Sequence, residues 1–191
     1  MITFARSQRF KRPIDYPLSI DTVQRKETTK NASITELSGL PARGRLLAID
    51  PGTKFIGIAV SDEDRIVTRP LRTIKRTSWK DLLLQIKDTV SEFDAVALVI
   101  GLPFAFDGGE TDMSAEARDM AKKFALSLDV PVFLQDERVT TYDARARLWA
   151  RNVPAEGTKP LVDAEAAAII LSDFICRVEE NAKRPNAERS E

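Results

Sequence analysis

Histidine is absent from this chain of 191 residues, and cysteine occurs once, at Cys176. Without histidine, the sequence excludes serine and cysteine nucleophiles that depend on a histidine base, and also histidine ligands for zinc or iron. A single cysteine excludes an internal disulfide and a cysteine-rich zinc site, and we expect this thiol to be buried and inert on a helix. A metal ion would need oxygen ligands, which favours magnesium or manganese.

The chain also lacks an excess of charge and a long hydrophobic run. Its 29 basic residues balance 29 acidic ones, so no global basic field indicates a nucleic-acid partner. The longest apolar run, residues 95–106, is too short to span a bilayer and is interrupted by Gly101 and Pro103. The N-terminus has no continuous apolar segment typical of a secretory signal, so a cytoplasmic protein is expected.

Three segments differ in composition. Residues 1–44 lack a sustained hydrophobic period and contain several prolines, which predicts a flexible N-terminal extension. Residues 45–180 hold the periodic hydrophobic pattern of a single folded domain. Residues 181–191 are a polar C-terminal tail.

The domain opens with an apolar strand at residues 46–50, which the Pro51-Gly52 turn separates from a second strand at 55–62. This connection is too short for a helical crossover, so the two strands must pair antiparallel. A third short strand is expected near residues 65–68 or slightly beyond. Further strands are predicted at 95–100 and 130–135, and helices at 78–93, around 117–128, at 140–152 and at 162–180, with a loop at 152–161. This order predicts an α/β fold, a mixed sheet of five strands with helices on both faces.

Acidic residues follow two of the predicted parallel strands, whose carboxyl ends share one edge of the sheet. Asp50 ends the first strand, and Asp136 and Glu137 end the last one, where alternation turns only one of the two toward the site. Asp163 begins the face of the last helix that packs on the sheet, whereas Glu165 is expected to point into solvent.

Each acid also has an ordinary structural explanation. Asp50 can bond its own turn, Asp163 can cap its helix, and Glu137 can pair with Arg138. Three carboxylates within ~5 Å of one another, however, repel by about 3 kcal/mol per pair at an effective dielectric constant near 20. They therefore either stay apart or hold divalent cations, and two such ions ~4 Å apart support phosphodiester hydrolysis by water.

Four motifs in this order resemble the YqgF/RuvX family of ribonuclease H-like nucleases. They are residues 47–62, which include Asp50-Pro51-Gly52-Thr53; residues 99–108 with Gly101-Leu102-Pro103; Asp136-Glu137-Arg138 with Thr140-Thr141; and Val162-Asp163-Ala164 with Ala166-Ala167. The resemblance implies a ribonuclease H-like fold and maturation of the 5′ end of pre-16S ribosomal RNA. It also implies that Asp50, Glu137 and Asp163 are the catalytic, metal-binding acids, with Asp136 as the second choice beside Glu137.

Lys54, Arg138 and Lys159 are the candidate substrate-binding cations, since they border the acids or lie in the predicted loop. The expected partners are structured RNA, including pre-16S rRNA and ribosomal particles, or branched DNA, with no membrane. The chain is expected to be a monomer or a weak homodimer. A resolvase of Holliday-type DNA junctions and a non-catalytic ribosome-binding module stay open as alternatives. An ATPase of the actin type is disfavoured because the chain is too short for two such domains.

Overall fold

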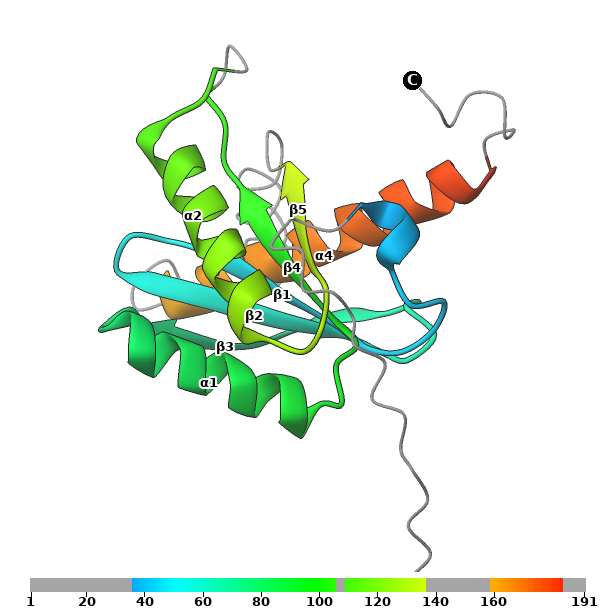
Figure 1. Cartoon of the computed structure of the whole chain (residues 1–191), viewed down its shortest axis with the longest axis horizontal. Coiled ribbons are helices and arrows are strands. Elements are labelled where there is room, and N and C mark those ends of the chain that lie inside the picture. The colour runs from blue at the N-terminus through cyan, green and yellow to red at the C-terminus, as the bar shows by residue number, and fades with distance from the viewer. Residues whose placement is uncertain (1–35, 106–108, 137–158, 184–191) are drawn as a thin grey trace, which may run out of the picture. The chain divides into compact units, whose positions relative to one another are not determined.

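A mixed sheet of five strands forms the centre of the fold. The computed structural model describes residues 36–105, 109–136 and 159–183. Within them the strands lie in the order β3-β2-β1-β4-β5 (Figure 1). The strands are β1 (Leu46–Pro51), β2 (Phe55–Ser61), β3 (Thr68–Lys75), β4 (Ala97–Leu102) and β5 (Val132–Asp136). β2 pairs antiparallel with both β1 and β3, whereas β4 pairs in parallel with β1 and β5.

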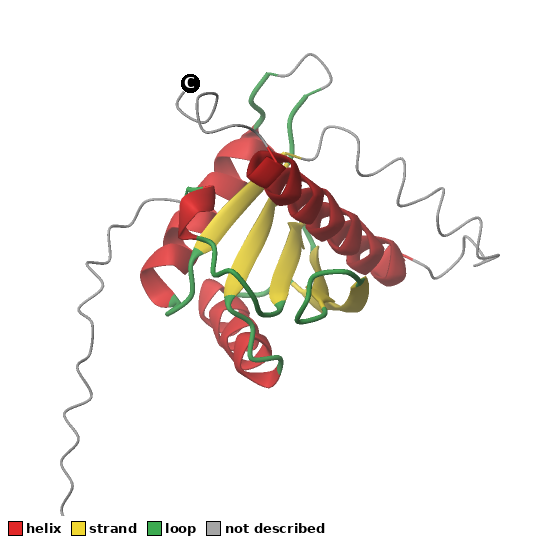
Figure 2. Ribbon diagram, turned by 90° about the vertical axis from the view of Figure 1, so that its right-hand side faces the viewer, coloured by secondary structure: helices red, strands yellow, loops and turns green. Residues whose placement is uncertain are grey.

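Helices cover both faces of this sheet. The described helices are η1, a 3₁₀ turn (Leu37–Gly39), α1 (Trp79–Glu92), α2 (Asp112–Ser127) and α4 (Lys159–Lys183). Figure 2 shows the long helix α4 across one face and the other two long helices against the opposite face. Strand order, strand directions and layers are those of the ribonuclease H-like fold, which confirms the predicted class.

The side chains of β1 contribute to a hydrophobic cluster on each face of the sheet. Leu47 and Ile49 pack in the cluster that includes residues of α1 and α2, whereas Leu46 and Ala48 pack in the cluster that includes residues of α4. All four are completely buried, as expected for a central strand that is apolar on both sides. By the same alternation, the Asp50 side chain lies on the α4 face.

The first helix begins where the sequence predicts. Ser78 is the N-cap of α1, and its hydroxyl accepts a hydrogen bond from the Asp81 backbone N–H at 3.1 Å. Leu82 and Ile86 are buried one turn apart on the side that packs on the sheet. The predicted amphipathic helix at 78–93 is therefore confirmed.

Two expectations for the last helix are wrong. Glu165 is only 4% exposed, although its position two residues after Asp163 predicts a solvated side chain. The reason is that every residue from Ala164 to Leu171 is buried, so this part of α4 has no solvent face. Cys176 is exposed rather than buried, because it lies two residues from Phe174, which packs on the sheet.

Several predicted boundaries shift. β3 starts at Thr68, because residues 62–67 form a turn in which the Asp62 carboxylate accepts hydrogen bonds from the Ile66 and Val67 backbone at 2.7 and 2.8 Å. β4 begins and ends two residues later than expected, and β5 begins at Val132. α4 starts at Lys159, which replaces the end of the predicted 152–161 loop by a first helical turn.

The predicted N-terminal extension and C-terminal tail lie mostly outside the described residues. The predicted extension is described only from residue 36, where Leu37 and Leu40 pack against the cluster beneath α4. The predicted helix at 140–152 also lies outside the described residues. Among the helices that the structure describes, none combines the length and the apolar character needed to cross a membrane. The predicted flexible extension and polar tail stay predictions.

Candidate active site

Asp50 lies between two glycines on the α4 face of the sheet. It pairs with Gly57 of β2, and the β1–β4 register, in which Ile49 faces Ile100, brings Gly101 to its other side. At Gly57 the helix backbone comes very close, since an added Cβ would overlap the Asp163 carbonyl and lie 2.8 Å from the Ala164 nitrogen. Only glycine fits here, and this close approach brings the start of α4 to the end of β1.

The second acid, Asp163, acts electrostatically on the first. Burial, and in second place the negative charge of Asp163, raise the pKa of Asp50 from 3.8 to about 7. None of the described residues donates a hydrogen bond to the Asp50 carboxylate. The structure thus brings two of the three predicted acids near each other, and among the residues it describes no hydrogen-bond donor stabilises Asp50 in its charged form.

This pair fits a divalent cation. A half-buried carboxylate next to a second one is destabilised when both are ionised, and a bound cation removes that destabilisation. Oxygen donors from aspartate are the ligands that Mg²⁺ and Mn²⁺ prefer. Within the described ranges, no group of three acidic, histidine or cysteine residues forms a complete cage. Glu137, the third predicted acid, and Arg138 lie outside the described residues.

Asp136 has a different neighbour. Arg177 of α4 reaches the end of β5, where its Nη2 donates to the Leu134 carbonyl at 3.0 Å, and its guanidinium lies 5.3 Å from the centre of the Phe174 ring. Burial lowers the pKa of Arg177, and the negative charge of Asp136 opposes this shift. Asp136, at the end of the edge strand β5, is therefore within electrostatic reach of the Arg177 guanidinium of α4, whereas the charged neighbour of Asp50 is Asp163.

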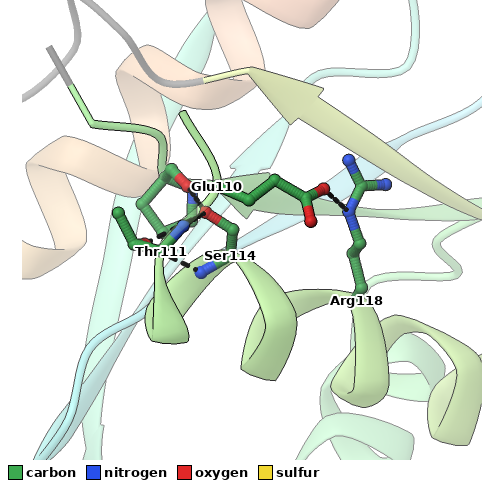
Figure 3. Close-up of polar contacts among 5 residues, drawn as sticks. Glu110, Thr111, Ser114 and Arg118 are labelled. Atoms are coloured by element: carbon green, nitrogen blue, oxygen red, sulfur yellow. Dashed lines mark hydrogen bonds and ion pairs between the residues drawn. The ribbon is translucent and has the colours of Figure 1, made fainter. Parts of the chain in front are cut away.

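The connection between β4 and α2 is fixed by the cap of α2. Thr111 and Ser114 form a reciprocal capping box, and the Ser114 hydroxyl also donates to the Pro103 carbonyl. Figure 3 shows this cap and the ion pair at 3.0 Å between Glu110 and Arg118 just beside it. The Gly101-Leu102-Pro103 motif is thereby anchored next to Asp50.

Arg76 is a residue near the site that the sequence did not indicate. Its backbone N–H donates to the Lys54 carbonyl at 2.9 Å, and its guanidinium approaches the Gly52 carbonyl at 3.5 Å and pairs with Glu116 of α2. It thus links the turn after Asp50 to a helix on the opposite face. Correct placement of the third strand at 68–75 would have revealed it, because β3 then ends opposite this turn.

The predicted substrate-binding cations are only partly described. Lys54 is exposed in the β1–β2 turn, four residues after Asp50. Lys159 is the first residue of α4, four positions before Asp163, and its side chain lies outside the described part. Two of the three candidate cations therefore come from the segments that carry the two acids.

Comparison with known proteins relates this chain to one protein family. Residues 44–177 match the profile of the RuvX family, described as Holliday junction resolvase. A protein of Anaeromyxobacter dehalogenans (strain 2CP-C) named "Putative pre-16S rRNA nuclease" is 38% identical over 133 residues, 70% of this chain and 97% of that protein. One of the same name from Rhodopseudomonas palustris (strain BisB18) is 36% identical over 138 residues, 72% of this chain and 85% of that protein.

Among solved structures, RuvC of T. thermophilus in complex with a Holliday junction substrate is similar at 18% identity. Its TM-score is 0.44, and the match covers 70% of this chain and 96% of that chain. The family profile covers the whole segment from β1 to Arg177 of α4, including all four motifs that the sequence carries. This chain therefore belongs to the RuvX family.

Proposed function

We propose that this protein is a divalent-metal-dependent endonuclease that hydrolyses phosphodiester bonds in structured RNA, in the maturation of the 5′ end of pre-16S rRNA. The observation that carries the proposal is the carboxylate pair of Asp50 and Asp163, in which burial and a second negative charge raise the pKa of Asp50 to about 7. Membership of the RuvX family supports the nuclease class, and the names of the relatives support the RNA substrate.

Asp50, Asp163 and Glu137 are proposed to hold the cation, Mg²⁺ or Mn²⁺. The bound ion supplies activation of a water molecule and stabilisation of the charge that develops on the phosphate oxygens. Asp50 is presented from the end of a buried strand and Asp163 from an enclosed helix, so both side chains come from rigid elements. The turn that follows Asp50 is fixed by Arg76.

Lys54, Arg138 and Lys159 are proposed to bind the phosphates of the substrate. Lys54 is exposed in the turn next to Asp50, where an ammonium attracts the nucleic-acid backbone without reading its sequence. Since the formal net charge of the chain is zero, such local cations would have to provide the attraction. A cytoplasmic location and a monomer or weak homodimer complete the proposal.

A second candidate, cleavage of four-way DNA junctions, is favoured by the description of the matching family profile. The two substrates are separated by cleavage assays with precursor 16S rRNA and with a synthetic junction in the same Mg²⁺ or Mn²⁺ buffer. Cleavage of RNA alone supports the first function, and cleavage of the junction alone supports the second.

The proposed chemistry is tested with Asp50→Asn and Asp163→Asn. Each variant is expected to lose cleavage while it keeps the circular dichroism of the folded chain. Asp88→Asn, which removes an exposed carboxylate from α1, is the matched control and should cleave at the wild-type rate. Cleavage by Asp50→Asn at the wild-type rate, or by wild type in excess chelator, would contradict the proposal.

A further inference from the structure

One row of residues crosses the sheet on its α4 face at the level of Asp50. Gly57 of β2 pairs with Asp50, Gly101 follows in β4, and Gln135 of β5 pairs with Gly101. Gln135 lies on the α4 face because it alternates with Leu134, whereas Phe133, which shares its face, packs against Phe174. Asp50 and Gln135 are thus separated on this face by a position without a side chain.

The Gln135 side chain is buried, and one of its two polar atoms has no partner. The residue is 7% exposed, and its Nε2 donates to the Asp136 carbonyl at 3.2 Å. Its Oε1 is buried and accepts no hydrogen bond from any residue that the structure describes. Native proteins leave few such atoms, and each one calls for a donor from a ligand or a water molecule.

The missing donor must be small and must carry a proton. Neighbouring strands lie ~4.8 Å apart, so the Gln135 and Asp50 backbones are about 10 Å apart across Gly101. Side chains on one face of a sheet stand roughly perpendicular to it, so the space above Gly101 between Asp50 and Gln135 is left open for a cation and one of its water molecules. Carboxylates and phosphate esters offer no proton, whereas a water molecule bound to a divalent cation is a strong donor.

We propose that Gln135 is a positioning residue whose Oε1 accepts a hydrogen bond from a water molecule of the cation held by Asp50 and Asp163. This inference rests on the proposed function, because it requires that cation. Gln135 would hold a water ligand of the cation on the side of the site that faces β5. Residues that bind a metal through its ligands typically change metal affinity by 10- to 100-fold when they are replaced.

A competing structural explanation involves Arg177. Its Nε is the other buried side-chain atom without a partner among the described residues, and Arg177 also reaches the end of β5. A water molecule between Arg177 and Gln135 would satisfy both atoms and would make Gln135 part of the packing only. That arrangement predicts loss of stability without loss of metal affinity when the amide is removed.

The experiment measures Mn²⁺ binding by electron paramagnetic resonance and thermal unfolding without metal. Gln135→Met keeps the length of the side chain and removes the amide, and Gln85→Met in α1 is the matched control. We expect Gln135→Met to bind Mn²⁺ about tenfold more weakly, with a metal-free Tm no lower than that of wild type, because the unpartnered acceptor is gone. Gln85→Met should bind as wild type does.

The outcomes separate this inference from the function on which it rests. Wild-type Mn²⁺ affinity in Gln135→Met, with binding abolished by Asp50→Asn, overturns the role of Gln135 and leaves the proposed metal site standing. A lower metal-free Tm with unchanged affinity overturns it in favour of the packing role with Arg177. Absence of Mn²⁺ binding in the wild type overturns both proposals together.

Discussion

Replacement of Asp50 by asparagine should make the metal-free protein more stable at alkaline pH. Asp50 has a pKa of about 7 in the folded state, because it is buried and lies near Asp163, and about 3.8 when unfolded. Between these values the unfolded chain releases a proton that the folded chain keeps, so the stability of the wild type falls as the pH rises. Asparagine has the same shape and does not ionise.

The size of the effect follows from the two pKa values. The two pKa values differ by 7 minus 3.8, or 3.2 pH units. Each unit corresponds to about 1.4 kcal/mol, so the free energy of unfolding of the wild type should fall by about 4 kcal/mol between pH 4 and pH 8. Asp50→Asn should avoid this loss. For a chain of this size, 4 kcal/mol corresponds to roughly 8–16 °C in Tm at pH 8 and to no difference near pH 4.

The assay is thermal or urea unfolding of chelator-treated protein from pH 4 to pH 8. Asp88→Asn, the exposed α1 carboxylate, serves as control and should follow the wild-type curve throughout. Addition of Mg²⁺ or Mn²⁺ at pH 8 should raise the Tm of the wild type and leave that of Asp50→Asn unchanged. Parallel stability curves for Asp50→Asn and wild type between pH 5 and pH 8 would refute the assignment of a half-buried, destabilised carboxylate.

Three further substitutions test how the site is assembled. Gly57→Ala should lower stability by about 3 kcal/mol in urea unfolding and weaken Mn²⁺ binding in a titration, because the new Cβ overlaps the Asp163 carbonyl. Arg76→Ala should reduce the cleavage rate about tenfold in a single-turnover assay, because the turn after Asp50 loses its link to Glu116, and an unchanged rate would contradict this role. Ser78→Ala should cost about 1 kcal/mol in urea unfolding through the lost N-cap and leave the cleavage rate at the wild-type value.

The regular elements were predictable where hydrophobic period and caps agree. The apolar strand at β1 and the short connection to β2 together required an antiparallel pair, and Ser78 marked the start of α1. The third strand was expected near residues 65–68 or slightly beyond and begins only at Thr68, because the Asp62 carboxylate accepts hydrogen bonds from the Ile66 and Val67 backbone in a turn that has no hydrophobic signature. The local sequence pattern predicts the bounds of a helix or strand well only when residues of a characteristic type, such as a capping serine, mark its ends.

Tertiary burial was harder to predict than secondary structure. Helical geometry correctly turned Ala167, Ile170 and Phe174 toward the sheet, but it also predicted a solvated Glu165. That error arises because a surface helix is assumed to have one solvent-exposed face, whereas α4 is buried on every side over eight consecutive residues. The alanines of this segment were the available signal, since small residues permit close packing all around a helix.

Within the site, the sequence correctly brought Asp50 and Asp163 together and could not indicate Arg76 or Gln135. An arginine at a strand end and a glutamine within an apolar strand have no distinctive spacing. Their roles appear only when the register across β1, β4 and β5 and the turn opposite β3 are known. The role of Glu137 stays a prediction, because this residue lies outside the described part of the chain.

The rigidity around the two acids explains why their repulsion is not relieved by movement. Asp163 is carried by a helix whose next eight residues are buried, and Gly57 lets that helix backbone contact β2 directly. Asp50 is fixed by a central strand and by the turn that Arg76 holds. Since neither backbone can move away without exposing core, uptake of a proton or a cation lowers the free energy of the pair. Protons and divalent ions must therefore compete for this site, and metal affinity should rise with pH up to about 7, the pKa of Asp50, and level off above it.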